Sequence, residues 1–164
     1  MKTRWVLALM AVVFGVAMYA GTVLATPQAG VTTTQLAKGG FGPIKVTTQD
    51  PVSGWQAALE TMGASDVYAV RNTFDPGGQT GWHTHPGPSL VIVTAGTITA
   101  YDGDDPTCTP KVYTAGQGFV DPGGGHVHIL RNETNLHAET VAIQLVPKDA
   151  PRRIDMPAPG NCPF

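Results

Sequence analysis

The sequence predicts an all-β fold, a barrel or sandwich of short antiparallel strands, and three observations support this class. Its 164 residues suffice for one domain of ordinary size. Twenty Gly and 14 Pro residues interrupt the chain so often that long helices cannot form. Between these breakers lie short runs of apolar and β-branched residues, ended by turn residues about every 8 to 12 positions, as in sandwiches and barrels.

Residues 1–25 have the pattern of a secretory signal peptide. Lys2 and Arg4 precede an unbroken apolar run, Trp5–Ala20. Val23 and Ala25 occupy the −3 and −1 positions of a cleavage site, so Thr26 would begin the mature chain. The sequence therefore predicts a secreted or periplasmic protein. An uncleaved segment would instead be long enough for an N-terminal membrane anchor, and the protein would then meet a membrane only there.

Two segments precede the main block of strands. Residues 26–50 are rich in Thr, Gly and Ala with weak patterning, which predicts a flexible lead-in and a first strand. A short N-terminal helix is predicted over Ser53–Met62. Ser53 and Gln56 fit a capping box there, and apolar residues recur at helical spacing.

The β-barrel itself is expected within residues 51–147, and a Pro-rich C-terminal tail over residues 148–164. Gly, Pro and Asp turns such as Asp75–Gly78 separate the strand-like runs. The expected strands are Asp66–Phe74, Ser89–Thr94, Thr97–Tyr101, Lys111–Tyr113, Gly118–Asp121, His126–Arg131 and Glu139–Val146.

Both cysteines, Cys108 and Cys162, follow the predicted cleavage site. In an oxidising compartment an even pair favours a disulfide, which here would tie the tail to the barrel. The alternative is two unpaired thiols. Neither cysteine lies in a C-x-x-C motif.

Four of the five histidines form two H-x-H pairs, His83 with His85 and His126 with His128. On a strand, residues i and i+2 point to the same face with their Cα atoms about 6.6 Å apart. Two imidazoles at that spacing can converge on one metal ion at N–metal distances of about 2.0–2.1 Å. A single histidine is more often a hydrogen-bonded polar residue, but two pairs in one small domain predict a metal site.

The residues around the first pair resemble motif one of the cupin superfamily, which reads G-x5-H-x-H-x3,4-E-x6-G. Gly77, His83, His85 and Gly96 match this motif at the family spacing. Ser89 stands where the family has glutamate.

The second pair lies in a segment similar to motif two of the same superfamily, G-x5-P-x-G-x2-H-x3-N. Gly116 and Pro122 match its first half, and Gly125, His128 and Asn132 match its second half. One extra glycine separates the two halves. The resemblance extends over residues 66–147. Within the superfamily, the sequence is most similar in kind to small secreted cupins that consist of a single domain.

The resemblance implies an antiparallel double-sheet jelly-roll barrel with one divalent transition metal (Fe, Mn, Zn, Ni or Cu) in its mouth. The implied ligands are His83, His85 and His128. A serine hydroxyl binds divalent ions more weakly than a carboxylate does, so Ser89 and His126 remain candidates for a fourth ligand or for contacts to the ligands. His128 is preferred over His126 because it keeps the family spacing to Asn132.

Several function classes are disfavoured. A net charge of −2 provides no basic surface for nucleic acid. The chain has no P-loop, dinucleotide fingerprint or nucleophile elbow, so nucleotide chemistry and serine hydrolysis are not expected.

Two hypotheses lead. One is an oxygenase-like enzyme, such as a three-histidine cupin dioxygenase, acting on a small chelating molecule. The other is a non-catalytic protein that binds a metal or a small ligand outside the cytoplasm. A third hypothesis is a metal-free structural barrel, in which the histidines serve only in packing or in polar networks. The sequence identifies no catalytic residue and leaves a homodimer open.

Overall fold

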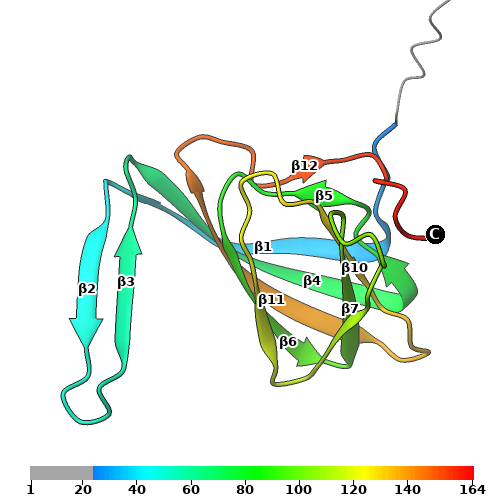
Figure 1. Cartoon of the computed structure of the whole chain (residues 1–164), viewed down its shortest axis with the longest axis horizontal. Helices are drawn as coiled ribbons and strands as arrows, with labels where there is room; N and C mark the ends of the chain where they lie inside the picture. The colour runs from blue at the N-terminus through cyan, green and yellow to red at the C-terminus, as the bar shows by residue number, and fades with distance from the viewer. Residues whose placement is uncertain (1–23) are drawn as a thin grey trace, which may run out of the picture.

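The computed structural model describes residues 24–164 as an antiparallel β-barrel from which one hairpin projects (Figure 1). Every regular element in this range is a strand, which confirms the all-β class. The predicted signal peptide lies outside the described residues apart from Leu24 and Ala25. Within residues 24–164, no helix has the length and apolarity needed to cross a membrane. The strands are β1 (Ala29–Phe41), β2 (Lys45–Gln49), β3 (Gln56–Glu60), β4 (Ser65–Gln79), β5 (His83–Thr84), β6 (Ser89–Ala95), β7 (Thr97–Asp102), β8 (Lys111–Thr114), β9 (Gly118–Asp121), β10 (His128–Arg131), β11 (Ala138–Pro147) and β12 (Ile154–Asp155).

Ten of these strands belong to one antiparallel sheet, which curves into the barrel. The sheet order is β12-β5-β10-β4-β11-β6-β9, with β1 paired to β4, and β7 paired to β10 and β8. The long strands β4 and β11 pair without a shift from Ser65 opposite Pro147 to Phe74 opposite Ala138. Strand β4 also pairs with β10, which carries His128, so this uninterrupted ladder adjoins the strand of one site histidine.

Alternation of side chains places the core inside the barrel. Along β6, Val91 and Val93 are buried, whereas Leu90 and Ile92 between them are exposed, as the period of two on a strand requires. The main core cluster consists of Phe74, Val93, Ile98, Ala100, Leu130 and Ala138. Leu130 also lines the pocket described below, so the core supports that pocket from beneath.

The short N-terminal helix predicted over Ser53–Met62 is wrong. The segment contains β3, which pairs with β2 in a hairpin that projects from the barrel (Figure 1). Ser53 does not cap a helix, because its backbone N–H donates to the Asp50 carboxylate within the hairpin turn at 2.8 Å. Gly54 closes this turn at φ 73°, in the left-handed region that glycine favours.

The apolar spacing that favoured a helix has no core to face in the hairpin. Trp55 is 62% exposed and Leu59 is 45% exposed. Pairing with β2, where Val46 and two threonines supply β-branched residues, determines the conformation instead.

Residues 26–50, expected as a lead-in with a first strand, contain the 13-residue strand β1. This strand pairs with β4 from Ala29 opposite Gln79 to Phe41 opposite Ser65. Most of the segment is therefore part of the sheet rather than flexible, because the edge of β4 offers a continuous row of backbone partners.

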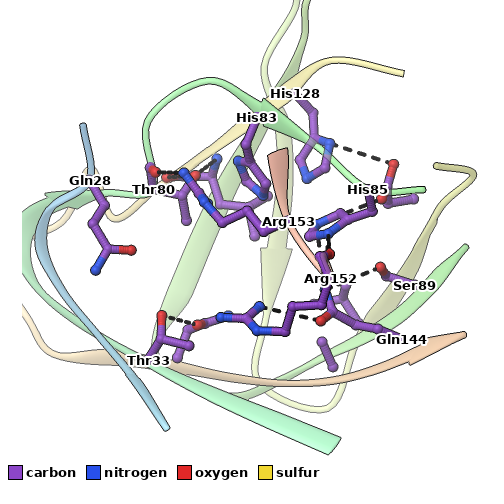
Figure 2. A pocket seen from close by; sticks show the side chains of 15 residues that line it. Gln28, Thr33, Thr80, His83, His85, Ser89, His128, Gln144, Arg152 and Arg153 are labelled. Atoms are coloured by element: carbon purple, nitrogen blue, oxygen red, sulfur yellow. Dashed lines mark hydrogen bonds and ion pairs between the residues drawn. The ribbon is translucent and has the colours of Figure 1, made fainter. Parts of the chain in front are cut away.

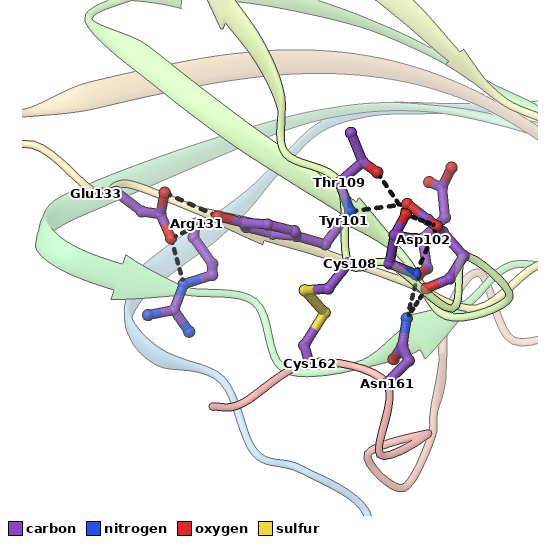
Figure 3. The surroundings of a disulfide bond; sticks show 10 residues. Tyr101, Asp102, Cys108, Thr109, Arg131, Glu133, Asn161 and Cys162 are labelled. Carbon is purple, nitrogen blue, oxygen red and sulfur yellow. Dashed lines mark hydrogen bonds and ion pairs between the residues drawn. A yellow bond between two sulfur atoms is a disulfide. The ribbon is translucent and has the colours of Figure 1, made fainter.

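The predicted disulfide between Cys108 and Cys162 is present and ties the tail to the barrel (Figure 3). Near it, the Asn161 side-chain amide donates to the backbone carbonyls of Asp102 and Asp105. The tail is therefore anchored at its end.

Two further contacts bring the tail across the barrel. The Phe164 ring stacks on Trp82 at a centroid distance of 6.5 Å. Strand β12 pairs with β5, placing Ile154 opposite Thr84 and Asp155 opposite His83. The preceding arginines of the tail consequently lie next to the histidines.

Candidate metal centre

The structure brings His83, His85 and His128 together in one pocket (Figure 2). His83 lies on β5, directly opposite His128 on β10, and His85 follows β5. Each imidazole offers one nitrogen, and these three nitrogens lie within 4.8 Å of one another. All three side chains are buried, so the set expected to bind a metal is assembled away from bulk water.

Backbone carbonyls orient two of the three rings. His83 Nδ1 lies 2.9 Å from the Gly81 carbonyl, and His85 Nδ1 lies 2.5 Å from the Arg152 carbonyl. A carbonyl only accepts, so each Nδ1 carries the proton and each Nε2 keeps a free lone pair. Histidines that bind metals are oriented in this way.

His128 is held differently. Its Nδ1 is buried and has no hydrogen-bond partner among residues 24–164. Asp121 Oδ1 lies 3.5 Å from this nitrogen. The His128 ring therefore lies between the Asp121 carboxylate and the imidazoles of His83 and His85.

Burial keeps these imidazoles neutral. Desolvation lowers the pKa of His83 well below its usual value, with a further contribution from His128 beside it. Desolvation also lowers the pKa of His85, and it lowers the pKa of His128 to about 4. At neutral pH all three are in the unprotonated form that binds metals.

The lowered pKa values predict a pH dependence for the metal-free protein. Between an unfolded pKa of about 6.5 and the lower folded pKa values, the unfolded state binds more protons, so the free energy of unfolding decreases as the pH falls through this window. Urea unfolding of chelator-treated protein at about pH 7.5 and pH 5 would measure this decrease, which we expect to reach a few kcal/mol. His128→Asn should show a smaller decrease. Equal stability of the native protein at the two pH values would contradict the prediction.

Two arginines from the tail enter the same pocket (Figure 2). Arg153 pairs with Asp155 at 2.6 Å and donates to the Thr80 carbonyl at 2.6 Å. Arg152 donates to the Gln144 side-chain oxygen at 3.3 Å and has no acidic partner within ion-pair distance in residues 24–164. Arg152 is therefore a guanidinium of the pocket that no carboxylate of the described residues pairs with, and Asp121 lines the same pocket.

Ser89 and His126, the two candidates for a fourth ligand, lie in different surroundings. Ser89 is buried, and its hydroxyl lies 3.4 Å from the Gln144 amide nitrogen that donates to it. His126 approaches Asp121 Oδ1 at 3.2 Å and does not group with His83 and His85.

The expectation that His126 shares a strand with His128 is wrong. Strand β10 begins at His128, because a glycine turn extends to His126: its backbone N–H donates to the Gly123 carbonyl, and Gly123–Gly125 have positive φ values. His126 lies instead near Asp102 and Asp104, and it also groups with Asp121 and His128, but it does not group with His83 or His85.

Sequence reasoning missed Asp121, Arg152 and Arg153. Asp121 ends an expected strand but lies outside both histidine pairs, and the arginines belong to the tail. Charged residues within an otherwise apolar or Pro-rich segment were the available signal. Nothing in the local sequence indicated that they reach the histidines.

The pocket itself is small, with a cavity volume of about 30 Å³. A volume of this size holds an ion or one to two water-sized groups. The protein is thus an antiparallel β-barrel whose pocket carries three buried histidines, which is the arrangement of a metal-binding β-barrel.

Comparison with known families agrees with this description. Residues 70–144 match the family model described as "Cupin domain". This part of the chain is therefore a cupin domain, which confirms the resemblance inferred from the two histidine motifs. The comparison with curated proteins found no match.

Solved structures show the same fold. An oxalate oxidase in complex with the substrate analogue glycolate is 23% identical, with a TM-score of 0.51 over 77% of this chain. This chain spans only 55% of that oxidase chain. Peruvianin-I, described as a cysteine peptidase from Thevetia peruviana latex, is 26% identical, with a TM-score of 0.50, covering 79% of this chain and 68% of its own.

Proposed function

We propose that this protein is an extracytoplasmic cupin metalloprotein that holds one divalent transition metal through His83, His85 and His128 and binds a small anionic chelating molecule there. The observation that carries the proposal is the convergence of three buried imidazole nitrogens within 4.8 Å. The apparent signal peptide and the disulfide support a location outside the cytoplasm.

The donor set fits such a metal. Three neutral imidazoles suit Fe, Mn, Zn, Ni or Cu and leave the full charge of the ion for further ligands. When bound, the metal would supply Lewis-acid polarisation of a coordinated molecule, or oxygen chemistry if it is iron. The contribution of the chain is to hold the rings in place through the carbonyls of Gly81 and Arg152 and to exclude bulk water.

The guanidinium of Arg152, which no carboxylate pairs with in the described residues, favours an anion as the bound molecule. Arg152 is half-buried and lines the pocket, and within residues 24–164 its only side-chain partner is the neutral Gln144. A guanidinium in this setting pairs well with a carboxylate. The cavity holds an ion or one to two water-sized groups, so such an anion fits beside the metal only if the Arg152 side chain shifts. The glycolate complex of the oxalate oxidase supports a small carboxylate as the first compound to test.

An oxygenase-like activity is the first functional candidate, and a non-catalytic metal or ligand binder is the second. A single fold can host both kinds of function. Elemental analysis of the protein purified from its native compartment tests the metal site directly. Dioxygen consumption by the iron-loaded protein with small chelating acids then separates the two candidates, because a binder should gain thermal stability without turnover.

Substitution of Arg152 by glutamine tests the anion site. The backbone carbonyl that orients His85 remains in this variant, so metal content should not change. We expect the affinity of the metal-loaded protein for glycolate to fall about tenfold, because one charge-assisted hydrogen bond is lost. Isothermal titration would measure the change. Arg71→Gln, a substitution on the barrel surface, serves as the control, and an equal effect in both variants would contradict the anion site.

A further inference from the structure

A carboxylate lies directly across from the serine that replaces the family glutamate. Strand β9 pairs with β6 so that Asp121 is opposite Ser89. Directly opposed residues of antiparallel strands share a face, and both side chains are buried in the barrel. Asp121 therefore enters the histidine pocket beside the position where motif one would place a carboxylate.

The two oxygens of Asp121 have different environments. Oδ1 accepts from the backbone N–H of Gly123 at 3.1 Å and lies 3.2 Å from His126 Nδ1. Oδ2 has no hydrogen-bond partner among the described residues, and water cannot readily supply one because the side chain is only 2% exposed. A buried carboxylate oxygen without a partner is costly, so native proteins seldom leave one unpaired.

The unpaired oxygen faces a lone pair. Asp121 Oδ2 lies 4.0 Å from His85 Nε2. Since His85 Nδ1 carries the ring proton toward the Arg152 carbonyl, Nε2 has none to donate. The Gln144 amide nitrogen lies 3.5 Å from Nε2, at the limit of a hydrogen bond. Two electron-pair donors thus face each other, an arrangement that a cation between them would stabilise.

We propose that Asp121 Oδ2 is a ligand of the metal held by the three histidines. In this role it replaces the glutamate of motif one, whose position Ser89 occupies. This inference rests on the proposed metal site. Gly123 and His126 hold Oδ1, which leaves Oδ2 free to coordinate. A carboxylate also favours Fe²⁺ or Mn²⁺ over Cu⁺, which prefers sulfur ligands.

Asp121→Asn is the direct test, since the amide retains an oxygen for Gly123 and removes the charge. We expect the affinity for Co²⁺ to fall at least tenfold and the visible absorption spectrum of bound Co²⁺ to change, because a ligand is altered. Asp66→Asn is the matched control: Asp66 is equally buried but pairs with Lys38 away from the pocket. Its Co²⁺ affinity and spectrum should equal those of the native protein.

Ser89→Glu combined with Asp121→Asn returns a carboxylate from the opposite strand. We expect this double variant to regain most of the Co²⁺ affinity lost in the single variant.

Three outcomes would overturn the assignment. The first is native Co²⁺ affinity in Asp121→Asn, and the second is weaker binding with an unchanged spectrum, which would mean that Asp121 acts only by positioning His128. The third uses the native protein and does not depend on the variants folding. With ¹³C-labelled Asp side chains, one equivalent of metal should shift a labelled carboxylate band in the infrared difference spectrum, and an unshifted band would exclude coordination. Failure of the native protein to bind Co²⁺ would instead count against the metal site as a whole.

Discussion

His128→Ala is expected to abolish stoichiometric metal binding, whereas His126→Ala should retain one metal per chain. His128 lies opposite His83 and contributes a nitrogen to the three-histidine cluster. His126 precedes β10 and faces Asp121 and Asp102 instead. Without the His128 imidazole the site loses one of its three nitrogen ligands. We therefore expect the affinity for the metal to fall by at least about a hundredfold.

Metal per chain after gel filtration, measured by elemental analysis, compares the two variants. His137→Ala provides a control for the loss of an exposed histidine. Circular dichroism should show that His128→Ala, which removes a buried ring, retains the β-sheet spectrum. Loss of metal confined to His126→Ala would reverse the assignment, and equal loss in both variants would favour a four-histidine site.

Removal of the disulfide is expected to give the largest change in stability. The two cysteines are separated by 54 residues, and the chain-entropy model gives about 4 kcal/mol as the upper contribution of a loop of this length. The Cys108→Ser, Cys162→Ser double variant should therefore unfold at a clearly lower urea concentration. The tail would also lose its anchor, so the contacts of Phe164 with Trp82 and of the Arg152 carbonyl with His85 should weaken.

Urea unfolding curves of the double variant and of native protein in a reducing agent should coincide, because both lack the same bond. A decrease of less than about 1 kcal/mol would show that the tail is held by its packing rather than by the disulfide. The double variant should also bind metal less tightly, since the loosened tail no longer orients His85.

The sequence by itself determined several strands of the barrel and the histidine pairs. The expected run Gly118–Asp121 has the observed bounds, and Ser89–Thr94 and Lys111–Tyr113 differ from the observed strands by one residue at the end. These elements depend on the period-two alternation and on Gly or Pro turns, which are visible within a few residues. The spacing of His83 and His85 is likewise local. The disulfide was predictable because two cysteines allow a single pairing.

The hairpin β2–β3 shows where local reasoning failed. Ser53–Met62 carries both a capping pattern and apolar residues at helical spacing, so a window of ten residues favours a helix. Pairing with Lys45–Gln49 decided otherwise, because the partner strand satisfies the backbone hydrogen bonds and no core lies beside the segment to bury a helix face.

Only the tertiary structure decided which charged residues join the histidines. Asp121 enters the pocket because β9 pairs with β6 in the register that sets it opposite Ser89. Arg152 enters because β12 pairs with β5 and the disulfide holds the tail behind it. Strand register and long-range closure depend on the fit between segments far apart in the chain, and a shift of one residue would turn Asp121 to the opposite face of the sheet. The pattern within any one segment cannot specify that register.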